Sequence, residues 1–115
     1  MAEYDLEERT FQFAKETSLF IKNLSKSISN IEFSKQVIRS SSSVGANYIE
    51  ANESLGKKDF VMHLRISRKE AKESVYWLRL ISETNETILS DKCKELIPEA
   101  IELKKIFSAI IEKSK

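Results

Sequence analysis

Glycine, proline and cysteine are scarce in this 115-residue sequence, which contains two glycines, one proline and one cysteine. Because glycine and proline punctuate loops, their scarcity predicts a few long regular elements joined by short connections. The remaining residues, chiefly Leu, Ile, Ala, Glu, Lys and Ser, favour helices. The length suits one domain, residues 1–115, with a single hydrophobic core.

Long apolar runs are also missing. No stretch approaches the roughly 18 to 20 apolar residues that are needed to span a bilayer. Residues 1–5 are acidic and lack the basic and apolar regions of a signal peptide. The single cysteine, Cys93, cannot form a disulfide within the chain, which agrees with a reducing compartment. We therefore expect a cytoplasmic protein that has no membrane partner.

Signatures of metal binding and catalysis are absent as well. The one histidine, His63, lies outside the Glu-x-x-His motif that a di-iron bundle draws from each of two helices. No Asn or Asp pattern marks His63 and Cys93 as a catalytic pair. The sequence therefore predicts a protein that is not an enzyme and has no catalytic residues, no metal and no cofactor.

Apolar residues recur at three-, four- and seven-residue spacing in four segments, as one face of an α-helix requires. The predicted helices cover residues of about 5–27, 33–55, 59–82 and 91–113. Amphipathic helices with short connections bury their apolar faces most simply in an up-down-up-down bundle. The predicted fold class is therefore all-α, a four-helix bundle.

Turn-forming residues predict the connections between these helices. The apolar stripe of the first helix includes Ile28, and residues 27–32 form the first break. Gly56 suits a left-handed helix end, and Asp59 suits the N-cap of the third helix. The polar residues 82–87 are expected to form the longest loop.

The start of the fourth helix is ambiguous because of Pro98. Ser90 or Asp91 could cap the helix, and its apolar stripe continues past the proline. Proline removes a backbone donor and clashes with the preceding turn. The helix should therefore either kink near residues 93–97, which we favour, or begin at Pro98.

A run of small residues in the second helix, within residues 39–47, is unusual for a helix interior. It contains four consecutive serines followed closely by Gly45, although glycine costs about 1 kcal/mol relative to alanine in a helix. No glycine-rich loop of the phosphate-binding type surrounds the serines. Small side chains let backbones approach closely, so this run predicts tight packing against a neighbour in the bundle or in an oligomer.

The chain has 19 basic and 18 acidic side chains, so nucleic-acid binding would need local clustering of charge. The most basic segment, residues 57–72, contains six cations and the two acidic residues Asp59 and Glu70. The cations are Lys57, Lys58, Arg65, Arg68, Lys69 and Lys72. The last four share one helix face and could follow phosphates, or they could form an ordinary solvated surface.

Two further groups of residues have an expected role between helices or between subunits. Arg39 and Asn47 would face the bundle, and either could pair with Glu73 and so fix the register of two helices. Tyr76 and Trp77 are adjacent and point about 100° apart on a helix, so one of them should lie outside the core. Because these residue types are enriched at interfaces, this pair predicts an oligomer contact.

Three motifs of the second and third helices are distinctive when they are taken together. They are Gln36-x-x-Arg39-Ser40-x-x-Ser43-x-x-Ala46-Asn47-x-x-Glu50-Ala51, Lys58-Asp59-Phe60 and Glu70-Ala71-x-Glu73-x-x-Tyr76-Trp77-Leu78. With these motifs, residues of about 11–111 resemble the four-helix-bundle family called S23 ribosomal protein, whose members are also known as 23S ribosomal RNA intervening-sequence proteins. Many family members read Ala-Asn-Ile-Ala-Glu-Gly where this chain has Ala46-Asn47-Tyr48-Ile49-Glu50-Ala51, and alanine in place of the glycine should extend the second helix towards Gly56.

The resemblance implies a helical bundle that assembles into a ring-like homopentamer, has a role in binding nucleic acid, and is not an enzyme. The accessory variability determinant proteins, which work beside a reverse transcriptase, are similar in fold and are more basic. Two hypotheses follow. The chain is either an oligomeric scaffold that binds RNA or DNA weakly without reading sequence, or a structural or adaptor protein that acts through protein contacts alone.

Overall fold

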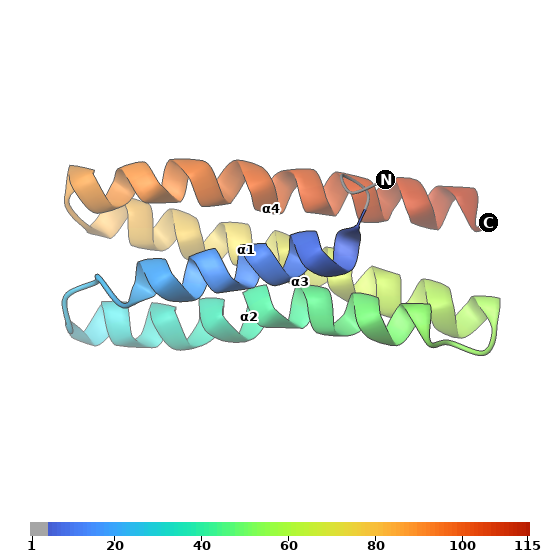
Figure 1. Ribbon diagram of the computed structural model, residues 1–115. Coiled ribbons are helices and arrows are strands. Elements are labelled where there is room, and N and C mark those ends of the chain that lie inside the picture. Colours follow the sequence, from blue (N-terminus) through green and yellow to red (C-terminus); the bar gives the residue numbers. More distant parts are fainter. Residues whose placement is uncertain (1–4) are drawn as a thin grey trace.

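The computed structural model describes residues 5–115, apart from the side chains of residues 88–90. Figure 1 shows four helices that run alternately up and down along one bundle. The helices are α1 (Leu6–Ile21), α2 (Ile28–Asn52), α3 (Lys57–Thr84) and α4 (Thr87–Lys113). The described residues include no strand. The predicted all-α, up-down-up-down bundle is therefore confirmed.

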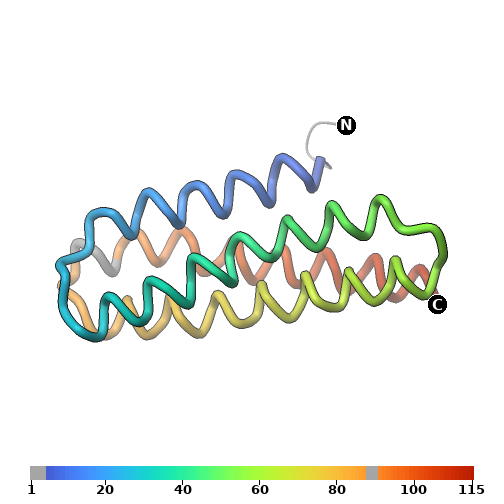
Figure 2. Tube along the Cα trace, turned by 90° about the horizontal axis from the view of Figure 1, so that it is seen from below, coloured from blue at the N-terminus to red at the C-terminus, as the bar shows by residue number. Residues whose placement is uncertain are grey.

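The chain reverses at the two ends of the bundle (Figure 2). The α1–α2 and α3–α4 connections lie at one end, and the α2–α3 connection lies at the other end together with the C-terminus of α4. Helix α3 packs extensively on both α2 and α4, whereas α1 packs on α2 and touches α4 much less. Helix α3 is therefore the central element of the packing.

The apolar stripes of the four helices meet in one core. Two residues of the predicted stripes are exceptions, because Ile28 is 87% exposed and Leu55 is 103% exposed. Both lie at helix boundaries that differ from the prediction. The buried core includes Leu6, Phe13, Phe20, Val37, Val44, Ala51, Leu64, Ala71, Leu78, Ile81, Leu96, Ala100, Leu103 and Phe107.

The first connection differs from the predicted break at residues 27–32. Helix α1 ends at Ile21, and α2 already begins at Ile28. The cause is a local cap, because the hydroxyl oxygen of Ser27 accepts a hydrogen bond from the Asn30 amide at 3.1 Å. The longest described connection is therefore residues 22–27, and the prediction for residues 82–87 was wrong.

A pair of asparagine side chains joins the two connections at this end. The Nδ2 atom of Asn30 donates to Oδ1 of Asn85 at 3.0 Å, and Nδ2 of Asn85 donates to Oδ1 of Asn30 at 2.9 Å. Asn30 also donates to the carbonyl oxygen of Ser25 at 3.0 Å. These bonds hold a tight turn between α3 and α4, with two residues between the helices.

The α2–α3 connection also differs in detail from the prediction. Helix α2 passes through Ala51 and ends at Asn52, short of Gly56. Gly56 has φ −146° and ψ 162°, so it is extended rather than left-handed, and it occupies the N-cap position of α3. Asp59 was therefore wrongly predicted as the cap; it lies in the first turn of α3, where its charge interacts favourably with the helix dipole.

Helix α4 begins at Thr87, four residues before the predicted start, so the alternative start at Pro98 is wrong. Figure 1 shows α4 as one uninterrupted helix. Pro98 lies inside it. Of the two predicted caps, Asp91 lies inside the helix, and the side chain of Ser90 lies outside the described residues. The proline is tolerated because Pro98 and Lys94 are exposed, so water can reach the backbone carbonyl that loses its partner.

The small residues of α2 pack tightly against both neighbouring helices. Buried Ser40 and Ser74 place their hydroxyl oxygens 2.8 Å apart between α2 and α3. The hydroxyl of Ser67 donates to the carbonyl oxygen of Val44 at 2.8 Å. On the side of α1, a Cβ added at Gly45 would lie 2.7 Å from Oγ1 of Thr10. The predicted role of this run in close packing within the bundle is therefore confirmed.

We predict that Gly45→Ala destabilises the protein, although alanine is the better helix former. Thr10 is buried, β-branched and bonded to the carbonyl oxygen of Leu6 at 2.6 Å, so its side chain cannot move aside easily. Overpacking of about 1–3 kcal/mol should exceed the roughly 1 kcal/mol gained in helix propensity. Urea unfolding should show the loss, and Gly45→Ala in a Thr10→Ala background should cost less. A Gly45→Ala variant that is more stable than wild type would contradict this packing.

Candidate nucleic-acid interface

The outer face of α3 carries the cations that the sequence analysis singled out. Their three-, four- and seven-residue spacing aligns them along the side of α3 that faces away from the core. Arg68 is partly buried and reaches towards α4, where its Nη1 atom lies 3.4 Å from the hydroxyl oxygen of Ser108. The exposed members are Lys57, Lys58, Arg65, Lys69 and Lys72.

Of the two acidic residues of the same segment, Glu70 is turned away from this outer face, whereas Asp59 is exposed at its beginning and lines the same groove as Lys57 and Lys58. Glu70 is 7% exposed and its Oε1 atom lies 3.1 Å from Nη1 of Arg39 on α2. Asp59 places Oδ1 3.7 Å from Nε2 of His63, one turn along α3. Among the side chains that the structure describes, none of the six cations forms an ion pair with a carboxylate. The charges of the five exposed cations are therefore available to an external anion, whereas Arg68 also acts on Glu112.

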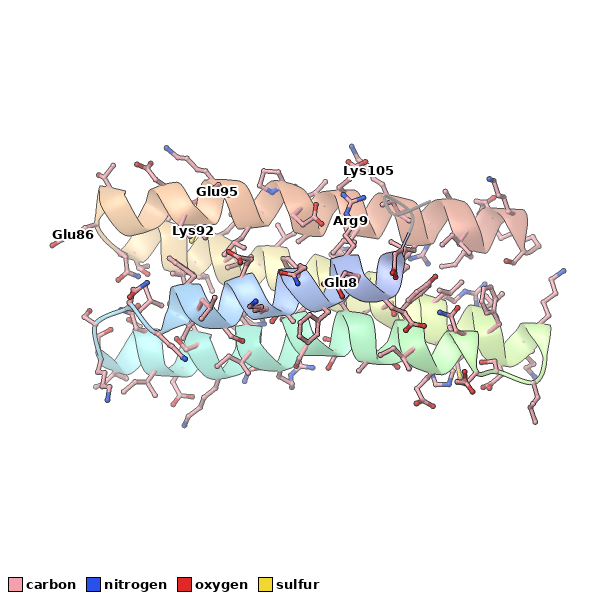
Figure 3. All side chains as sticks on the ribbon, viewed as in Figure 1. Glu8, Arg9, Glu86, Lys92, Glu95 and Lys105 are labelled. Atoms are coloured by element: carbon pink, nitrogen blue, oxygen red, sulfur yellow. The ribbon has the colours of Figure 1, made fainter. Side chains whose placement is uncertain are left out.

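The face formed by α1 and α4 is different in character. Figure 3 labels Arg9 and Lys92 there, beside the acidic Glu8 and Glu95. Arg9 donates from Nε to Oε2 of Glu99 at 2.8 Å, and this bond raises the pKa of Arg9. Arg9 and Lys92 thus pair with carboxylates of the neighbouring helix, unlike the cations of α3.

A shallow groove of about 1090 Å³ lies at the open end of the basic face, where α3 begins and α4 ends. Its apolar lining comes from Val61, Met62 and Ile66 of α3. The Nζ atom of Lys115 lies 2.8 Å from Oε2 of Glu112. This bond lowers the pKa of Glu112, and the charge of Arg68 makes a smaller contribution in the same direction. The basic residues around the groove are Lys57, Lys58, Arg65, Lys69 and Lys115.

The predicted polar network is partly assembled. Arg39 bonds to Glu73 as well as to Glu70, so it bridges two carboxylates one turn apart on α3. Loss of water lowers the pKa of Arg39, but the two carboxylates outweigh this effect and leave it raised. Asn47 lies elsewhere: its Nδ2 donates to the carbonyl oxygen of Ser43 at 3.0 Å. Sequence reasoning missed Glu70 as a partner, although its three-residue spacing from Glu73 is a usable signal.

Tyr76 and Trp77 occupy different environments, as their positions on a helix require. Tyr76 is 57% exposed, whereas Trp77 is partly buried and packs against the core. The Trp77 ring lies 6.2 Å from that of Phe33 and 5.0 Å from that of Tyr76, between ring centroids. Its Nε1 donates to Glu73 at 3.1 Å, which connects it to the polar network. Tyr76 is therefore the aromatic side chain that is open to a partner.

The reactive side chains are far from any catalytic arrangement. Cys93 is fully buried, and burial raises the pKa of its thiol to about 11. His63 contacts Asn47 at 3.4 Å and Asp59, with no contact to Cys93. Among the described residues, no group of three His, Cys, Asp or Glu side chains could hold a metal ion. None of the described helices is long and apolar enough to cross a membrane.

We predict that Arg39→Leu destabilises the protein more than Glu73→Leu does. Loss of Arg39 leaves the buried Glu70 carboxylate without its cation, whereas loss of Glu73 leaves Arg39 paired with Glu70. Because Arg39 is half exposed, Arg39→Leu should lower the free energy of unfolding by only about 1–2 kcal/mol. Glu73→Leu should lower it by less than about 1 kcal/mol. Chemical unfolding measures the free energy of unfolding of each variant. Arg39→Leu with Glu70→Leu should recover most of the stability, and equal stability of the two single variants would contradict the bridge.

Comparison with known proteins agrees with this structure. The sequence model of the family described as 23S rRNA-intervening sequence protein matches residues 2–109. A crystal structure of a protein of unknown function from the S23 ribosomal protein family of Bacteroides thetaiotaomicron is similar, with a TM-score of 0.82 and 28% identity; the match covers 97% of this chain and 99% of the other. A comparison with curated proteins finds no match. The chain therefore belongs to the 23S rRNA-intervening sequence protein family, as the resemblance of its α2 and α3 motifs indicated.

Proposed function

We propose that this protein is a non-enzymatic, homo-oligomeric scaffold that binds RNA or DNA weakly through the outer face of α3. The observation that carries the proposal is the separation of charge on α3. Five of the six cations of residues 57–72 are exposed, and none of the six forms an ion pair with a described carboxylate. Glu70 is buried against Arg39, so Asp59 is the acidic residue of the segment that remains exposed beside them. Such a row of cations attracts a phosphate backbone and releases its counterions.

The chemistry of this face supports contact with the backbone rather than recognition of sequence. Helix α3 contains no Asn or Gln, the side chains that pair with the edge of adenine. Most of its outward cations are lysines, which act as mobile point charges. The family name refers to 23S rRNA, which favours RNA as the ligand of this chain.

Repetition of the basic face in an oligomer would strengthen a weak contact. Several copies on one assembly bind the same polymer with an avidity well above that of one copy. Tyr76, at 57% exposure beside half-buried Trp77, supplies an aromatic contact for a second subunit. The similarity to ring-forming relatives makes a homopentamer the proposed assembly.

One observation favours the alternative function, an adaptor that acts through protein contacts. The face formed by α1 and α2 exposes apolar side chains at 42–60% of their surface. Contiguous exposed apolar groups on a small protein commonly mark an interaction site. These side chains are Phe11, Leu19, Ile31, Ile38 and Ile49.

We predict that the α3 cations account for nucleic-acid binding. Fluorescence anisotropy with labelled RNA and DNA should show binding that weakens with salt, with a log–log slope of about −0.9 per duplex phosphate contacted. Changing Arg65, Arg68, Lys69 and Lys72 to Gln should lower the affinity roughly tenfold or more.

The matched control removes four exposed cations from α1, α2 and their connection, by changing Lys15, Lys22, Lys26 and Lys35 to Gln. This variant has the same net charge as the α3 variant, so it should lose much less affinity if position matters. Equal losses would show that only net charge matters. Absence of binding by the wild type at low salt would favour the adaptor function.

We predict that Tyr76→Glu dissociates the oligomer and leaves the helices intact. An added charge opposes burial of this side chain between subunits, whereas the exposed position makes the change harmless within one subunit. Size-exclusion chromatography with light scattering measures the mass, and circular dichroism measures the helix content. Phe11→Glu, at 60% exposure on α1, is the matched control. A monomeric wild type, or dissociation by Phe11→Glu alone, would contradict this interface.

A further inference from the structure

The groove at the beginning of α3 combines two kinds of side chain that a binding site for phosphates alone would not need. Lys58, Arg65 and Lys69 lie along its length, and Met62 and Ile66 lie between them. Met62 is 46% exposed, and Ile66 is partly buried. A ligand that covers this groove therefore meets positive charge and apolar surface alternately along about three turns of helix, with one carboxylate, Asp59, in the first turn.

The double helix and the single strand differ in what they present to such a surface. In a duplex the bases are stacked and paired, so a shallow groove outside the duplex meets mainly phosphates and sugars. In a single strand the bases are free to turn away from the backbone and pack against apolar or aromatic side chains. Alternation of cations and aliphatic side chains therefore fits an unpaired strand better than a duplex.

We propose that the groove binds unpaired nucleotides, with phosphates on the cations of α3 and bases packed on Met62, Ile66 and Val61. This inference rests on the proposed nucleic-acid function and names its ligand class as single-stranded RNA or DNA. Packing of a base on aliphatic groups tolerates every base, so the contact adds affinity for single strands without reading sequence.

The position of the cations favours a nucleic acid over an acidic helical peptide in this groove. The row of cations continues beyond the groove to Lys72, and Arg68 lies beside it on the α4 side. A polymer with one charge on every unit can use the whole row, whereas a peptide helix needs apolar contacts along its full length. The apolar lining stops at Ile66, so the outer part of the row would contribute little to a peptide.

The test compares three labelled oligonucleotides of equal length: a single strand, the corresponding duplex, and a single strand with abasic sites. The abasic strand keeps every phosphate and lacks bases. We expect the wild type to bind the intact single strand several-fold more tightly than either of the other two. Met62→Gln should weaken binding of the intact strand about fivefold and leave the abasic strand and the duplex unchanged. Ile28→Gln at the start of α2, where exposure is 87% and the position is at the other end of the bundle, is the matched control and should change nothing.

The outcomes separate this inference from the function on which it rests. Equal affinity for the three oligonucleotides, with a steep salt dependence, would overturn the base contact and leave phosphate binding in place. No binding of any oligonucleotide at low salt would overturn both. An acidic helical peptide that displaces the strand, and that Met62→Gln weakens more than the strand, would assign the groove to a protein ligand and overturn the inference.

Discussion

The close contact between α2 and α3 is the constraint on which the rest of the molecule depends. Serine side chains allow the two backbones to approach, and they satisfy one another while buried: Ser40 and Ser74 share a bond of 2.8 Å, and Ser67 donates to the carbonyl oxygen of Val44. Larger apolar residues at these positions would push the helices apart. At the edge of this contact the helices are close enough for Arg39 to reach two carboxylates of α3.

This contact also decides where the charges of α3 lie. The chain as a whole is nearly neutral, with 19 basic and 18 acidic side chains, so its composition indicates no preference for an anionic ligand. Pairing of Glu70 and Glu73 with Arg39 fixes these two carboxylates on the α2 side of α3. Lys72, which lies between them in sequence, and the exposed cations that precede Glu70 are left on the outer side. A stabilising ion bridge on one face of the helix thus produces an uncompensated basic surface on the other.

The sequence predicted what depends on periodicity and missed what depends on contacts between distant residues. Apolar spacing was enough to identify the four helices and most of the core, because each stripe must face inward. The start of α2 was placed wrongly because of the local cap at Ser27, and the tight α3–α4 turn was missed because it depends on the bond between Asn30 and Asn85, 55 positions apart. In the candidate site, Arg39 was expected beside Glu73, whereas Asn47 was misplaced. Because the helices are antiparallel, Asn47 is two turns further along α2 and faces His63, nearly three turns back along α3.

The first turn of α3 provides an independent argument for an anionic ligand. Lys57 and Lys58 are exposed there, at the positive end of the dipole of a 28-residue helix, where cations are unfavourable and only Asp59 offsets them. Neither lysine forms an ion pair with a described carboxylate, so the folded subunit gains no evident stability from them. Residues that are unfavourable at their position in a helix, and that do not stabilise the fold in another way, are expected at functional sites. The two lysines thus add to the positive charge at the beginning of the outer face of α3, in agreement with the proposed binding of phosphates by that face.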